Sequence, residues 1–212
     1  MTRRALSRVL PFVLLALSAC SIAPPPRDIV AYDFGPVAPI AGKSRLVLNL
    51  NVAEVIAPGW MNNANLHYRL AYINAARPLP YANSRWVMPP AALFTQRLRS
   101  TLQQASGAAV VSPADGVNAE YALHVDLEEF SQVFDSVEKS RGVMRLRARL
   151  AKGRSVAAQQ TFSIEVPAPG ANAEGGVRAL SLASDEACRK LLDWLAVSFV
   201  ENGTAAPERC LK

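Results

Sequence analysis

The sequence predicts an α+β fold, a single domain in which two long helices pack on one face of a mostly antiparallel sheet. Several segments carry apolar residues at every second position, which is typical of strands with one buried face. Two longer segments carry them at three- and four-residue spacing, the pattern of amphipathic helices. At 212 residues, 50% of them hydrophobic, the chain suits one globular domain of ordinary size.

The first nineteen residues have the pattern of a secretory leader, which we expect to be removed. Arg3, Arg4 and Arg8 precede an uncharged apolar run over residues 9–19. That run is too short to cross a bilayer, because a spanning helix takes about 20 apolar residues. Without the three arginines the chain keeps 20 of its 23 basic residues against 17 acidic ones. The basic balance is therefore no argument for nucleic-acid binding, and we expect no nucleic-acid partner.

The residues Leu17-Ser18-Ala19-Cys20 at the end of the leader resemble a bacterial lipobox. The resemblance implies a diacylglyceryl thioether on Cys20, cleavage before it, and acylation of the new amino group by a fatty acid such as palmitate. One fatty chain at about 0.8 kcal/mol per buried CH₂ binds membranes only marginally, whereas three chains hold durably. Ser21 stands where an Asp often retains lipoproteins in the inner membrane, which favours the periplasmic face of the outer membrane. An ordinary secretory signal with an incidental cysteine is the alternative.

Residues 20–30 are expected to hold the lipidated cysteine and a proline-rich tether. Three consecutive prolines at 24–26 favour an extended polyproline II strand that rises ~3.1 Å per residue. The seven residues 21–27 would then separate the domain from the membrane by about 20 Å.

Strands are expected before the first long helix, at residues 45–52, 67–72 and 81–87. Pro89-Pro90 should open the helix, since proline suits the first helical position, and Gly107 should end it. Its apolar stripe leaves Arg97 on the solvent side.

Four further strands and a second long helix are expected after Gly107. Their ranges are 108–111, 121–134, 144–150, 156–166 and, for the helix, 177–202. The alternation changes phase at Glu128-Glu129, which predicts a bulge there, and residues 167–176 are expected to form a loop. The domain would thus cover residues 31–203 and leave a flexible tail at 204–212.

The sequence contains no motif that predicts catalysis, so we expect no enzyme, no cofactor and no metal. A glycine-rich phosphate loop, a nucleophile elbow and a dense Cys/His spacing are all missing from it. His124 and Asp126 share one face of a strand and could form a base with its orienting carboxylate. An exposed strand pair is the preferred interpretation.

A basic stripe of Arg145, Arg147 and Arg149 faces the acidic run 126–129 of the preceding strand. Cross-strand charge pairs are the preferred interpretation. Binding of anionic lipid head groups, worth about 1 kcal/mol per basic residue, is the alternative.

Cys188 and Cys210 are a candidate disulfide, because an oxidising periplasm permits one. Cys188 lies on the apolar stripe of the second helix, however. A buried free thiol is therefore the preferred interpretation.

Five short blocks together resemble the ABC-type transport auxiliary lipoprotein family, which includes proteins like paraquat-inducible protein C. These blocks are Tyr32–Pro36, Ala57–Trp60, Tyr68–Tyr72, Tyr81–Trp86 and Pro89-Pro90. The resemblance covers roughly residues 31–199 and implies a non-enzymatic part of a system that moves phospholipid or organic solvent between membranes. It further implies, as partner, a periplasmic mammalian-cell-entry (MCE) domain protein, beside an inner-membrane ATPase and permease.

A partner interface is predicted at Tyr68, Tyr72, Tyr81, Arg85 and Trp86. Tyrosine, tryptophan and arginine are enriched at protein interfaces and their energetic centres. For Trp86 and two of the tyrosines, the preferred interpretation is that they fill the core beneath the first helix.

Two other function classes stay open. A lipoprotein regulator or docking factor for a cell-wall synthase would need a longer tether than about 20 Å of proline strand. A periplasmic acyl-chain carrier would need an apolar cavity between the sheet and the helices, and could take phospholipid as its ligand.

Overall fold

The computed structural model describes residues 28–37, 39, 49–106 and 110–203. The expected leader, Cys20, most of the tether, Gly107 and the tail with Cys210 lie outside the described residues, as does the first part of the strand expected at 45–52. Within the described part of the chain, no helix has the length and apolar character needed to cross a bilayer.

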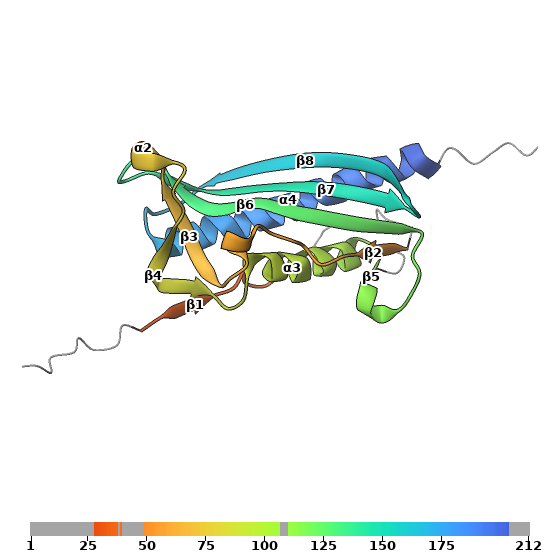
Figure 1. Cartoon of the computed structure of the whole chain (residues 1–212), viewed down its shortest axis with the longest axis horizontal. Coiled ribbons are helices and arrows are strands. Elements are labelled where there is room, and N and C mark those ends of the chain that lie inside the picture. Colours follow the sequence, from red (N-terminus) through yellow and green to blue (C-terminus); the bar gives the residue numbers. More distant parts are fainter. Residues whose placement is uncertain (1–27, 38, 40–48, 107–109, 204–212) are drawn as a thin grey trace, which may run out of the picture.

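Eight strands form one sheet, and two long helices run along it (Figure 1). The strands are β1 (Val30–Tyr32), β2 (Leu50–Val52), β3 (Asn65–Leu70), β4 (Leu79–Trp86), β5 (Val110–Val111), β6 (Tyr121–Phe134), β7 (Ser140–Lys152) and β8 (Ser155–Pro167). The helices are α2 (Ala71–Asn74), α3 (Pro90–Ala105) and α4 (Ala173–Gly203), with 3₁₀ turns η2 (Gly59–Met61) and η3 (Pro113–Asp115).

The long strand β6 organises the sheet. One edge of β6 pairs antiparallel with β7 along its whole length, and β7 pairs antiparallel with β8. The other edge is shared, because β2 pairs with residues 121–123 and β3 with residues 132–134, both in parallel. The outer pairs β1–β4 and β2–β5 are also parallel.

The α+β class is therefore confirmed, but the sheet is mixed rather than mostly antiparallel. Helix α3 connects β4 to β5, two strands that are not neighbours in the sheet. The expected phase change in β6 is also confirmed, since the register shifts between Leu127 and Glu129.

The core lies between the sheet and the two long helices. Leu98 and Leu102 of α3, Leu191 and Leu195 of α4, and Leu146 of β7 are fully buried. Burying each such side chain stabilises the fold by roughly 1.5–3 kcal/mol.

Close approach of α4 to the sheet depends on glycine in β7. A Cβ at Gly142 would lie 2.8 Å from the backbone of Ala179 and Leu180. Only a residue without a side chain fits at that point.

Helix α4 begins at Ala173, four residues earlier than expected. Asn172 caps it, because its Oδ1 accepts a hydrogen bond from the Gly175 N–H at 2.8 Å. Gly175 and Gly176 belong to the first turns of the helix rather than to a loop. A Cβ at Gly176 would lie 2.1 Å from Oε1 of Gln132, so glycine serves contact with β6 here.

Other elements also differ from the expectation. Strand β3 ends at Leu70, which places Tyr72 in the short helix α2. Strand β1 was not expected, since its three largely exposed residues carry no alternating pattern.

Candidate functional site

A short segment after β1, which we call the strap and define as Asp33–Pro36, crosses the end of the core. Phe34 is its buried residue, and its ring lies 5.4 Å from that of Trp86 and 5.6 Å from that of Phe130. Gly35 adopts a left-handed φ of 71°, and its N–H donates to Asp33 Oδ1 at 2.7 Å. The turn and the aromatic contacts together fix the strap on the domain.

Arg97 of α3 holds the strap through its backbone. Its Nη2 donates to the carbonyl oxygens of Phe34 and Gly35, both at 2.6 Å, and its Nη1 donates to that of Pro36 at 3.0 Å. Nη1 also lies 3.2 Å from Asp185 Oδ1 on α4. Arg97 therefore joins the strap to both long helices, and we call this set of contacts the arginine clamp.

The Arg97 side chain is only 3% exposed, although the helical pattern placed it on the solvent side. That expectation is wrong because a segment distant in the sequence covers this face of α3 and supplies carbonyl acceptors. Burial raises the pKa of Asp185, while the positive charges of Arg97 and Arg189 act in the opposite direction.

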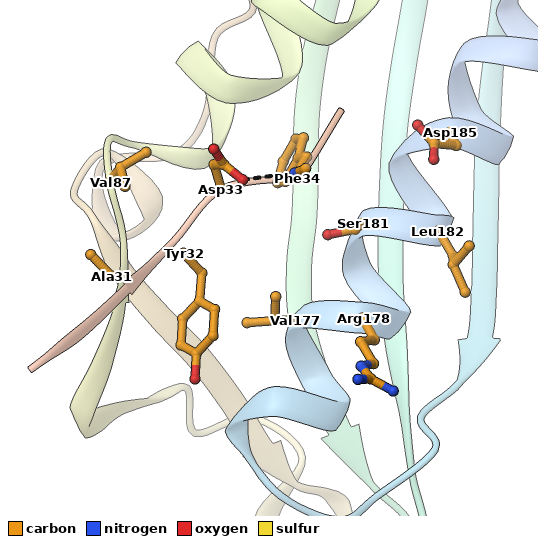
Figure 2. A pocket seen from close by; sticks show the side chains of 11 residues that line it. Ala31, Tyr32, Asp33, Phe34, Val87, Val177, Arg178, Ser181, Leu182 and Asp185 are labelled. Carbon is orange, nitrogen blue, oxygen red and sulfur yellow. Dashed lines mark hydrogen bonds between the residues drawn. The ribbon is translucent and has the colours of Figure 1, made fainter. Parts of the chain in front are cut away.

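Two hollows flank the strap. The larger, about 610 Å³, lies between β1, the strap and the first half of α4 (Figure 2). Tyr32, Val87, Val177 and Leu182 give it an apolar lining, and Arg178 stands among the polar residues of its wall. A smaller hollow of about 290 Å³ lies on the α3 side of the strap. The larger hollow opens widely to solvent.

Three of the five residues predicted at a partner interface face the helices. Trp86 is 1% exposed in the core. The rings of Tyr68 and Tyr81 lie 4.6 Å apart, and the Tyr81 hydroxyl donates to Gln132 Oε1 at 2.8 Å. Burial raises the pKa of Tyr81. A register shift between β3 and β4 brings Tyr81 and Trp86, of opposite parity, to the same side of the sheet.

The other two residues, Tyr72 and Arg85, are exposed to solvent. Arg85 lies opposite Asn65 in the β3–β4 pair, whereas Tyr72 lies beyond the other end of that pair. The structure thus leaves two separated side chains available to a partner.

A family model matches residues 32–191 of the chain, a range that extends from the strap to α4. That model describes an ABC-type transport auxiliary lipoprotein component. The chain belongs to this family. The match includes Arg97, Asp185 and the strap, so the arginine clamp lies wholly inside the family domain of this auxiliary lipoprotein.

Two crystal structures have a similar fold. The chain is similar to a DUF330 family protein from Xanthomonas campestris, with 17% identity and a TM-score of 0.70, over 80% of this chain and 95% of that one. It is also similar to an uncharacterized protein, with 14% identity and a TM-score of 0.57, over 73% and 96% of the two chains. No curated protein sequence matches the chain.

The auxiliary lipoprotein also carries a polar cluster on the outer face of the sheet. Arg69 pairs with Glu129 at 2.9 Å, and its guanidinium lies 5.1 Å from the centre of the Trp60 ring. His67 is buried beside Trp60, and this burial lowers the pKa of His67. Ser131 completes the cluster by donating to Glu129 Oε1 at 2.7 Å. The cluster was not predicted, because Glu129 was expected to pair with the arginines of the basic stripe on β7.

Charge pairs across β6 and β7 are confirmed. Asp126 lies 3.0 Å from Arg149 and 3.4 Å from Arg147, while Glu128 lies 3.4 Å from Arg145. Arg147 and Arg149 therefore pair with Asp126, the carboxylate that was considered as the orienting partner of His124. Among the described residues, no group of three His, Cys, Asp or Glu side chains could hold a metal ion.

Cys188 is 1% exposed, and burial raises its pKa to about 12. Cys210 lies outside the described residues, so the Cys188–Cys210 disulfide stays a prediction.

Proposed function

We propose that this lipoprotein is a non-catalytic part of an MCE-type ABC transport system that moves phospholipid or organic solvent between membranes. Its partner would be the periplasmic MCE-domain protein. The family match over residues 32–191 is the observation that supports this most, because the matching model describes an ABC-type transport auxiliary lipoprotein component.

The membrane anchor in this proposal is the lipidated Cys20, on the periplasmic face of the outer membrane. Nine residue steps separate Cys20 from Ile29. At about 3.3 Å per residue they span at most about 30 Å. The anchored domain would thus stay close to the bilayer surface.

Mass spectrometry of the mature N-terminal peptide tests the anchor. The expected product begins at Cys20 and carries the mass of a diacylglyceryl group and an amide-linked fatty acid. A Cys20→Ser variant should keep its leader and lack the lipid. Density-gradient fractionation should find the natural chain in the outer membrane and a Ser21→Asp variant in the inner membrane. An unmodified Cys20 in a chain that keeps its leader would overturn the anchor.

The partner surface in this proposal includes Arg85 and Tyr72, the exposed members of the predicted interface. Arg85→Glu reverses a charge on β4 without disturbing the core. Co-purification with the MCE-domain protein should fall strongly in this variant. Arg154→Glu, in the exposed turn between β7 and β8, is the matched control and should bind normally. Unchanged co-purification of Arg85→Glu would remove this surface from the proposal.

The non-catalytic role is proposed because three carboxylates inside the domain form ion pairs with arginines. The buried or half-buried carboxylates of Glu129, Asp126 and Asp185 each form an ion pair with an arginine. These pairs link strands and helices, which gives them structural tasks.

A further inference from the structure

The outer edge of β8 is a long, free sheet edge. Among the described strands, β8 pairs with β7 alone, and it extends over 13 residues (Figure 1). Natural proteins usually protect such edges with lysines, prolines, bulges or short strands. Beyond a register shift near its first residues, β8 carries one charge, at Glu165, and one proline, at its last position. An edge with so little protection suits pairing with another strand.

A hollow of about 640 Å³ lies between this edge and α4. Ile164, Val166 and Leu182 contribute apolar surface to it, and Glu186 and Arg189 line its helix side. Leu182 is 56% exposed. A strand added to β8 would direct alternate side chains toward α4 and into this hollow.

We propose that the β8 edge pairs with β8 of a second copy of this chain, antiparallel and around a twofold axis at Thr161. Thr161 is the midpoint of Ser155–Pro167, so this register aligns the two strands along their whole length. Residues 158–164, which lie beyond the register shift, form the centre of the pair. On the helix side Ala158 meets Ile164, a favourable apolar pair, and Gln160 meets Phe162.

On the opposite side of the strand, the same register is also free of conflict. Thr161 meets its own copy, a favourable cross-strand pair, and Gln159 meets Ser163. Glu165, the one charged residue of β8, meets Ala157, so like charges are not placed opposite each other. The strand is thus complementary to itself, which argues for a second copy rather than a different protein.

The helices fit this arrangement. Helix α4 packs against β7 and β8 and, to a lesser extent, against β6, so its axis lies inside the edge. With strands about 4.8 Å apart, the two α4 axes would lie at least about 10 Å from each other, so the helices of the two copies would not clash. A strip about 43 Å long and about 20 Å deep covers on the order of 800 Å² per copy, the usual size of a stable interface.

Cysteine cross-linking of the full chain, purified in detergent and mildly oxidised in a Cys210→Ser background, tests the pairing. Opposed Cα atoms in an antiparallel pair lie about 4.5–5.5 Å apart, within the range for a disulfide. Thr161→Cys should therefore form a disulfide-linked dimer in high yield. Thr161 is exposed, so the substitution should leave the fold intact.

Gln159→Cys and Ser163→Cys are the matched controls on the same side of the strand. In the proposed register each lies about 13 Å from its own copy, so neither should cross-link alone. The variant that combines both substitutions should form the dimer, because each introduced thiol would then face the other one across the axis. Native mass spectrometry of the natural chain should report two copies.

Three results would overturn the proposal. A monomeric mass together with no cross-link at Thr161→Cys would exclude the dimer. Equal cross-linking of Thr161→Cys and Gln159→Cys would indicate random collision. A disulfide from Thr161→Cys to a different protein in intact cells would assign the edge to another partner.

Discussion

Replacing Arg97 with methionine removes the arginine clamp while keeping a long side chain in its place. The variant loses three hydrogen bonds from a charged donor to backbone carbonyls and leaves Asp185 without its buried partner. Breaking a buried ion pair by removing one partner costs roughly 3–5 kcal/mol. The Asp185 side chain is 31% exposed, so water replaces part of the lost interaction. We therefore expect a loss of about 3 kcal/mol in the free energy of unfolding.

Thermal unfolding followed by circular dichroism measures this loss. For a chain of this size, about 3 kcal/mol lowers Tm by roughly 6–12 °C. Hydrogen exchange should also quicken at the Val87 amide, which donates to the carbonyl of Tyr32, the residue just before the strap. Arg99→Met is the control, because Arg99 bonds one carbonyl and pairs with the exposed Glu54. It should cost about 1 kcal/mol. Equal losses in both variants, with unchanged exchange at Val87, would refute the clamp.

Three more predictions concern the packing of single residues. Gly142→Ala should cost roughly 1–3 kcal/mol because its Cβ would meet the backbone of α4, whereas Gly59→Ala, with open space around it, should be nearly neutral by the same thermal assay. Because burial lowers the pKa of His67, the folded state binds its proton less well than the unfolded state, so stability should fall as the pH drops below about 6.5. His67→Asn should reduce this pH dependence in urea unfolding at about pH 7.5 and about pH 5, and the exposed His124→Asn should leave it unchanged. Cys188 should resist alkylation at about pH 8 until the chain unfolds, as peptide mass spectrometry would show; rapid labelling of the folded chain would contradict its burial.

Strong local patterns allowed much of the fold to be predicted from the sequence. Strands β6, β7 and β8 alternate over many residues with one buried face, and the phase change at Glu128-Glu129 marks the observed bulge. Pro90 begins α3 as expected. These features depend on neighbours along the chain, which the sequence displays directly.

Features that depend on distant segments were missed. Arg97 has the pattern of a solvent-facing helical residue until the strap is placed over it. Gly175 and Gly176 have the pattern of a loop. The reason for glycine at 176 is the close contact with Gln132, a residue distant in the sequence. The capping residue Asn172 was a usable signal for the earlier start of α4.

The predicted partner interface likewise combines a local pattern with a feature that depends on pairing between strands. Its residue types are those of interfaces, but a register shift between β3 and β4 turns Trp86 and Tyr81 toward the helices. No local pattern indicated that shift. Tyr72 and Arg85 remain available at the surface.

Purification of the tagged, lipid-carrying chain from detergent-solubilised membranes, with quantification of bound proteins, tests the proposed transport role most directly. We predict that an MCE-domain protein elutes with the natural chain in a fixed ratio and is lost with Arg85→Glu. Recovery of the correctly lipidated chain without any MCE-domain protein, while a cell-wall synthase elutes with it, would contradict that role.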